Sequence, residues 1–230
     1  MVKTLPNATP RDPRDAVVDA LMALAAERPW AEITLPDIAA RAGIPLRELR
    51  AHFPSKGAIL GAFARRIDLA VLADESKDLS AEPARERLFD VLMRRLDALA
   101  PYKPALRGIR SGITREPLAL AAMNRTVVTS MQWMLAAADI NEEGPLGATK
   151  AQVLAFHWSR VLNTFLSDED PGLASTLKAL DREMRAAERL ARRGRDLQDL
   201  AGALYRTACR ITGRDGERRR DEVEEPTPSI

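Results

Sequence analysis

Apolar residues recur every three to four positions through most of the chain, which is the spacing of one face of an α-helix. Between Arg14 and Glu27, for example, Val17, Leu21 and Leu24 form one such stripe. Long segments of alternating, β-branched residues are absent from the sequence, and Ala, Leu and Arg are abundant. The pattern therefore predicts an all-α fold.

A short helix is predicted from Leu35 to Ala42, with a clear signal at each end. Thr34 stands at the N-cap position, and Asp37 three residues later completes a pair that resembles a capping box. Gly43 follows as the helix stop, because glycine adopts the left-handed backbone of such a stop without strain.

A second short helix is predicted directly after this stop, in the sequence LRELRAHF that follows Pro45. Leu49 and Phe53 would hold it against the first helix, while its basic and polar side chains face outward. Two short helices joined by a tight turn form a helix-turn-helix, whose second helix enters the major groove of DNA. The candidates for DNA contact on this second helix and beside the two helices are Thr34, Leu46, Arg47, Glu48, Arg50, His52 and Lys56.

The charge distribution supports this interpretation locally. From Arg41 to Arg66 the chain has six basic residues and a single acidic residue, Glu48, whereas the whole chain has a net charge of only +2. A basic cluster on a nearly neutral protein is what contact with phosphates requires. A solvated outer face is the alternative explanation for the same charges.

The segment from about Asp15 to Arg66 also contains short motifs in a fixed register. They are Thr34, Ile38-Ala39, Ala42-Gly43, His52-Phe53 and Pro54-Ser55-Lys56. With these motifs the segment resembles the N-terminal DNA-binding domain of the TetR family of bacterial transcriptional regulators. The resemblance implies a homodimer, here expected to be a repressor, that binds a palindromic operator. It also implies a second helical domain, in which we expect an apolar small-molecule effector.

Two positions depart from the pattern of that family. Arg50 stands where the family usually has a Tyr that touches a phosphate, and an arginine can reach a phosphate at least as well. Pro45 stands where the family usually has a Ser or Thr cap. Proline fits the first turn of a helix, but it offers neither a capping side chain nor an N–H group.

The pattern divides the chain into four parts. We expect a flexible arm at 1–13, the helix-turn-helix domain at 14–70, a helical ligand-binding and dimerisation domain at 79–212, and a charged, disordered tail at 213–230. The helices predicted for the second domain are Pro83–Ala100, Pro104–Thr114, Pro117–Ala138, Thr149–Leu166, Pro171–Arg192 and Arg195–Ile211.

Two of these helices have wide apolar faces that can line a pocket between helices for an apolar ligand. The candidate pocket residues are Met131, Met134, Phe156, Trp158, Leu162 and Phe165. The alternative for the same faces is the core of the helix bundle or a dimer interface.

Other functional classes find little support in the sequence. The two histidines, His52 and His157, lie far apart, and none of the common catalytic or metal-binding motifs is present. We therefore expect no enzyme activity, no metal and no cofactor, and a packed role for His157. The single cysteine, Cys209, and the lack of an N-terminal apolar run favour the cytoplasm.

The segment 156–190 carries a second, weaker resemblance, through Trp158, the helix end from Phe165 to Asp168, and Leu180-Asp181-Arg182. It resembles the C-terminal part of a lipid-binding family of ubiquinone biosynthesis, which shares the TetR-type fold and ends in an amphipathic, membrane-contacting helix. A comparable stripe of apolar residues lies at 195–211. The rival interpretation is therefore a lipid- or isoprenoid-binding accessory protein with little specific DNA binding. A last helix that docks on its own domain or on a dimer mate is the simpler alternative.

Overall fold

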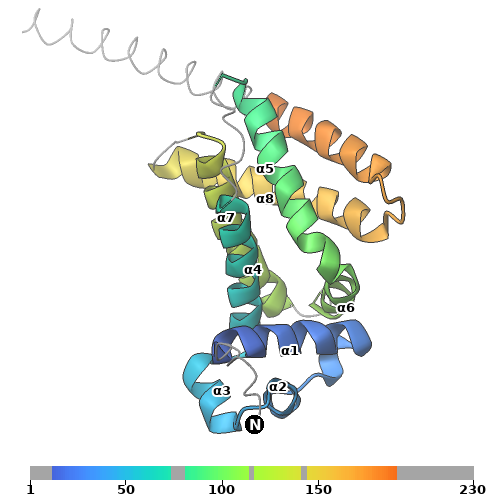
Figure 1. Cartoon of the computed structure of the whole chain (residues 1–230). Helices are drawn as coiled ribbons and strands as arrows, with labels where there is room; N and C mark the ends of the chain where they lie inside the picture. Colours follow the sequence, from blue (N-terminus) through green and yellow to red (C-terminus); the bar gives the residue numbers. More distant parts are fainter. Residues whose placement is uncertain (1–11, 74–80, 114–116, 141–143, 191–230) are drawn as a thin grey trace, which may run out of the picture. The chain divides into compact units, whose positions relative to one another are not determined.

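The computed structural model describes residues 12–73, 81–113, 117–140 and 144–190. Within these ranges all regular structure is helical, so the all-α prediction is confirmed. The described residues up to 184 belong to one compact unit, and those from 185 onward belong to a second. The helices of Figure 1 are α1 (Pro13–Glu27), the 3₁₀ turn η1 (Trp30–Glu32), α2 (Leu35–Ala42), α3 (Leu46–His52), α4 (Lys56–Leu72), α5 (Ala84–Leu99), the 3₁₀ turn η2 (Ala100–Tyr102), α6 (Lys103–Ile113), α7 (Pro117–Ala137), α8 (Gly144–Ser167) and a further helix over 174–190.

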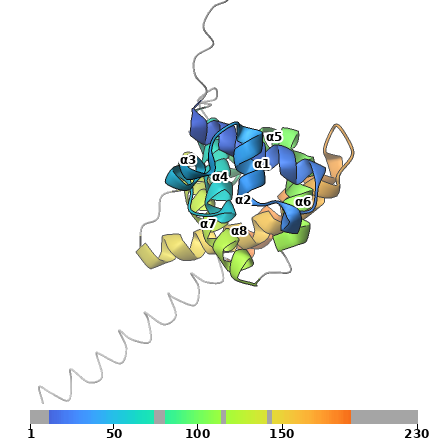
Figure 2. The same cartoon turned by 90° about the horizontal axis from the view of Figure 1, so that it is seen from below.

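The first three helices form a small head. They lie together at the lower end of Figure 1, and they are seen from below in Figure 2. The head is held together by completely buried aliphatic side chains from each of its helices, which are Leu21, Ile38 and Leu49, and by Ile59 from the start of α4. The polar positions between them face outward, as the helical spacing predicts.

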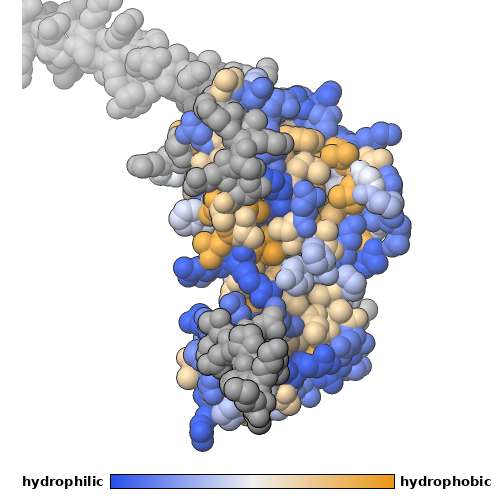
Figure 3. All heavy atoms as spheres, in the orientation of Figure 1, coloured by the Kyte–Doolittle hydropathy of each residue, from blue (hydrophilic) through white to orange (hydrophobic). Residues whose placement is uncertain are grey.

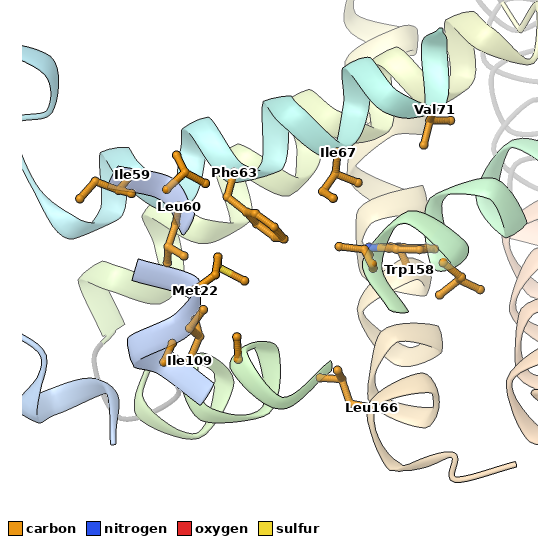
Figure 4. Packing of buried hydrophobic residues seen from close by; sticks show 14 of the residues in the cluster. Met22, Ile59, Leu60, Phe63, Ile67, Val71, Ile109, Trp158 and Leu166 are labelled. Atoms are coloured by element: carbon orange, nitrogen blue, oxygen red, sulfur yellow. The ribbon is translucent and has the colours of Figure 1, made fainter. Parts of the chain in front are cut away.

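Helix α4 leads out of the head and packs against α5 and α7 in the body of the molecule. Its buried residues follow one side of the helix from Ile59 and Leu60 through Phe63 to Ile67 and Val71 (Figure 4). One continuous apolar stripe therefore joins the core of the head to the core of the body.

Helix α6 makes a second connection to the head, because it lies directly on α1 and η1. A Cβ atom on Gly108 would lie 2.3 Å from the carbonyl oxygen of Ala25, and one on Gly112 would lie 2.5 Å from the Cβ of Trp30. Only glycine permits the close approach to the Ala25 backbone at Gly108 and to the Trp30 side chain at Gly112. Figure 4 shows Met22 of α1 between α4 and α6, so its side chain packs where the three helices meet.

Most predicted helix boundaries agree with the structure to within one or two residues, but two starts were wrong. Helix α8 begins at Gly144 rather than at Thr149, because Gly144 adopts a φ of 76° and turns the chain into the helix. The helix predicted from Pro171 begins at residue 174. Asp170 caps the intervening turn, accepting hydrogen bonds from the N–H groups of Gly172 (3.0 Å) and Ala174 (3.2 Å).

Some predictions fall outside the described residues. They are the arm over 1–11, the helix over 195–211, Cys209 and the tail over 213–230. His157 lies within the described part and is a packed residue as predicted, with 8% of its surface exposed and its Nδ1 2.8 Å from a carboxylate oxygen of Glu183.

The surface above the head differs from the surface of the head. Hydrophobic residues reach the visible surface around α7, whereas the border of the head is mostly hydrophilic (Figure 3). Each of the described helices is too short or too polar to cross a membrane.

Candidate nucleic-acid interface

The start of α2 is fixed by the predicted capping box. The Thr34 hydroxyl accepts a hydrogen bond from the N–H of Asp37 at 3.3 Å, and the Asp37 carboxylate accepts one from the N–H of Thr34 at 2.9 Å. The same hydroxyl donates to the Asp37 carboxylate at 2.7 Å, and Arg28 lies 3.1 Å from it. Hydrogen bonds from Thr34, with the charge of Arg28, lower the pKa of Asp37.

The turn between the two helices has the geometry that its sequence predicts. Gly43 adopts a φ of 72° and a ψ of 25°, the left-handed conformation of a helix stop. The N–H of Ile44 reaches back to the carbonyl of Ala39 at 3.1 Å, which completes the cap. Pro45 is the N-cap of α3 and contributes only its carbonyl, which accepts from the N–H groups of the first turn.

Helix α3 is anchored by its apolar side and presents its polar side to solvent. Leu49 is completely buried, and Phe53, which ends the helix, is 2% exposed. The guanidinium of Arg14 in α1 lies 5.2 Å from the Phe53 ring, which adds a cation–π contact. On the opposite side Arg47 and Arg50 are exposed.

The predicted α3 residues therefore share one short helix, but they are not equally accessible. Leu46 is 47% exposed, beside the two exposed arginines, whereas Glu48 and His52 are half-buried toward the edges of this surface. We call the surface formed by Leu46, Arg47 and Arg50 the α3 face.

The six basic residues from Arg41 to Arg66 do not all remain available for an anionic partner. Arg41 forms an ion pair with Glu27, which raises the pKa of Arg41 and lowers that of Glu27. Arg66 donates to the carboxylate of Asp19 at 2.7 Å. Arg47 and Arg50, in contrast, have no ion-pair or hydrogen-bond partner for their side chains among the described residues. The same holds for Arg65 on α4, which is also exposed. The α3 face therefore carries two of the three arginines of this segment that have no partner among the described residues.

Lys56 has an internal role that the sequence does not reveal. Its ammonium donates to the carbonyl oxygens of Trp30 at 3.0 Å and Ile33 at 2.8 Å, and it lies 4.4 Å from the centre of the Trp30 ring. These contacts hold η1 against the start of α4. Thr34 likewise uses its hydroxyl within the capping box, so both predicted phosphate contacts lie beside the α3 face with structural roles of their own.

The six candidate pocket residues differ in burial, and Leu162 is half-buried. Met131, Met134, Trp158 and Phe165 are packed in the core with at most 3% of their surface exposed. Phe156, in contrast, is 57% exposed on the outside of α8. The described residues also contain no group of three or more His, Cys, Asp or Glu placed to bind a metal ion.

Comparison with known proteins agrees with this geometry. Residues 17–63 match the model of the family described as bacterial regulatory proteins, tetR family. A TetR transcriptional regulator from Nitrosomonas europaea ATCC 19718 is 27% identical, with a TM-score of 0.60 over 76% of this chain and 97% of that one. A TetR transcriptional regulator from Rhodococcus sp. RHA1 has the same fold, with 20% identity and a TM-score of 0.56 over 76% of this chain and 95% of that one. No curated protein matches the sequence.

Proposed function

Because residues 17–63 match the model of the tetR family of bacterial regulatory proteins, we propose that this chain is a transcriptional repressor that binds a palindromic operator through α3. The chain has the fold and the DNA-binding domain of a tetR-family regulator. The observation that carries the finer proposal is the α3 face, where two exposed arginines have no partner among the described residues.

The two arginines suit DNA for different reasons. A guanidinium forms paired hydrogen bonds with the edge of a guanine in the major groove, or with a phosphate. Arg47 lies in the first turn of α3, the end that meets the bases when a recognition helix enters the groove. Arg50 lies in the last turn and is proposed to contact the DNA backbone. Half-buried His52 and Glu48 would then adjust the edges of the contact.

A homodimer follows from the size of α3. A helix of 7 residues contacts too few base pairs for useful affinity, whereas a twofold dimer places two such helices in successive major grooves about 34–36 Å apart. Large exposed apolar side chains on the body, Trp133 and Phe156, are 54% and 57% exposed in the single chain. We propose that Phe156 on α8 is covered by a second copy.

The DNA-binding proposal is tested by selecting sheared genomic fragments with the purified full chain at two salt concentrations. We expect a palindrome to be enriched, with an affinity that falls as salt rises. The variant with Arg47→Gln and Arg50→Gln should lose the selection, whereas Arg125→Gln, an exposed arginine on α7, should keep it. Equal retention of every fragment by both variants would contradict a role for the α3 face.

The dimer is tested by sedimentation velocity with Phe156→Glu. A charge placed in an apolar interface leaves an uncompensated buried carboxylate, so the dimer should dissociate at least tenfold more readily. Leu69→Glu is the matched control, because Leu69 on α4 is 55% exposed in the single chain. Dissociation of neither variant, or of both equally, would place the interface elsewhere.

Release by a small-molecule effector completes the proposal. Both α4 and α6 connect the body to the head, so a ligand that moves either helix would change where α3 lies and would shift the population of DNA-binding molecules. Met131 on α7 and Phe165 on α8 are completely buried, so an apolar effector bound beside them would have to rearrange these side chains.

A further inference from the structure

A hollow of about 510 Å³ lies between α6 and the end of α8. Six polar or charged residues line it, and they are Arg107, Arg110, Ser111, Asn163, Ser167 and Glu169. None of the candidate pocket residues of the apolar core is among them. We call this hollow the α6–α8 pocket.

The side of α6 that faces this pocket is basic. Lys103, Arg107 and Arg110 are spaced four and three residues apart, so they lie along one side of the helix, and α6 contains no acidic residue. Lys103 donates to the carbonyl of Asp168 at 3.0 Å. Arg107 donates to the carbonyl of Leu166 and lies 2.8 Å from a carboxylate oxygen of Glu169.

Two groups at the pocket are left without such contacts. The guanidinium of Arg110 is exposed, and no hydrogen-bond or ion-pair partner for it occurs among the described residues. The same holds for the side-chain amide of Asn163, which lies on the α8 side. A guanidinium and an amide across one hollow provide the paired donors that a carboxylate or phosphate group accepts.

We propose that the α6–α8 pocket binds a small molecule that carries carboxylate or phosphate groups, and that this molecule is the effector of the regulator. Arg110 and Asn163 hold its anionic group, while Arg107 exchanges part of its contact with Glu169 for the ligand. The effector role rests on the proposed DNA-binding function, whereas the binding of the anion does not.

The position of α6 explains how such a ligand would reach the head. Arg107 ties α6 to the end of α8 on one side, and Gly108 and Gly112 touch Ala25 and Trp30 of the head on the other. The backbones of α6 and α1 are in direct contact at Gly108, since even one added carbon atom there would collide with the Ala25 carbonyl. A shift of α6 on ligand binding is therefore passed to α1 and η1, and the operator affinity changes with it.

The anion site is tested without DNA, by calorimetric titration of the full chain with citrate and with inorganic phosphate at matched ionic strength. We expect saturable binding of at least one of them, weakened about tenfold or more by Arg110→Gln, because a charge-assisted hydrogen bond is lost. Arg125→Gln removes the same charge from the exposed surface of α7 and should leave the binding within about twofold. No saturable binding, or equal losses in both variants, would overturn the site.

The effector role is tested by adding the bound anion to the complex with the selected operator. Affinity should fall further than with chloride of the same ionic strength, and Arg110→Gln should abolish the excess. An anion that binds but weakens the operator complex no more than chloride does would overturn the effector role. A chain that selects no operator would contradict the DNA-binding function, and the calorimetric result would still decide on the pocket.

Discussion

The arginines of α3 and the arginine in the centre of the body use the same side chain for opposite purposes. Arg47 and Arg50 are exposed and unpartnered within the described residues, whereas Arg95 of α5 is 5% exposed. Arg95 donates to the carboxylate of Asp68 on α4, and the hydroxyl of Ser130 on α7 donates to the same oxygen. The positive charges of Arg47 and Arg50 are therefore available to an external partner, whereas the charge of Arg95 is neutralised by Asp68 inside the fold.

The difference shows what solvent does to a charge. Burial lowers the pKa of Arg95, and the carboxylate of Asp68 opposes this change. Arg95 also lies 5.6 Å from the ring centre of Trp158, and its Nε has no hydrogen-bond partner among the described residues. A buried guanidinium is tolerated only because its countercharge is buried with it, whereas arginines on the α3 face remain hydrated and place no such demand on the fold.

The largest expected effect comes from breaking the buried pair. Asp68→Ala leaves the Arg95 guanidinium in an apolar environment without a countercharge, and it should lower the free energy of unfolding by about 3–5 kcal/mol. Urea denaturation followed by circular dichroism measures the loss. Because α4 joins the head to the body, the same variant should also make the unfolding of the two parts less cooperative.

Replacing both partners separates the charge from the packing. The double variant with Asp68→Leu and Arg95→Met removes both charges and keeps most of the volume, so it should recover most of the lost stability. If Asp68→Ala alone costs less than about 1 kcal/mol, the Arg95 guanidinium does not need Asp68 as a buried countercharge, which would contradict this prediction.

The next effect concerns DNA and leaves stability unchanged. Arg50→Gln should weaken binding about equally for all operator variants and reduce the salt dependence by about one phosphate, whereas Arg47→Gln should relax the preference at one base pair at a cost of about 1–3 kcal/mol. Fluorescence anisotropy with an operator and its single-base variants, at several salt concentrations, measures both. Exchanged outcomes would mean that α3 lies in the groove with the opposite end inward.

The sequence predicts the head better than the body because the signals of the head are local. The capping box of Thr34 and the stop at Gly43 involve residues within a few positions of each other, so the sequence alone identifies α2. The contact of Lys56 with the carbonyl of Trp30 spans 26 residues, and nothing near Lys56 in the sequence indicates it.

The body depends on contacts of still longer range. The ion pair of Asp68 with Arg95 spans 27 residues, and the sequence pattern places Asp68 among ordinary helical positions. The predicted apolar pocket rests on apolar spacing, which is the same for a packed core and for a lined cavity, so it stays a prediction. The glycines of α6, four residues apart, were an available signal for close helix packing, and they mark the contact with the head that sequence reasoning missed.

The smallest effect belongs to a charged network that remains in solvent, the capping box of α2. Thr34→Ala removes the hydroxyl that hydrogen-bonds to Asp37, and it should cost about 1 kcal/mol at neutral pH.

The lowered pKa of Asp37 sets the direction of the pH dependence. Its stabilising contribution is present above the pKa of an unfolded aspartate, about 3.9, and is lost as the pH falls through the lower pKa of the folded state. The difference between the wild type and Thr34→Ala should therefore shrink toward about pH 3, while Thr34→Ser, which keeps the hydroxyl, should follow the wild type. Urea denaturation at both pH values measures this, and a difference that is constant with pH would mean that Thr34 acts on α2 only as an acceptor for the backbone, independently of the charge of Asp37.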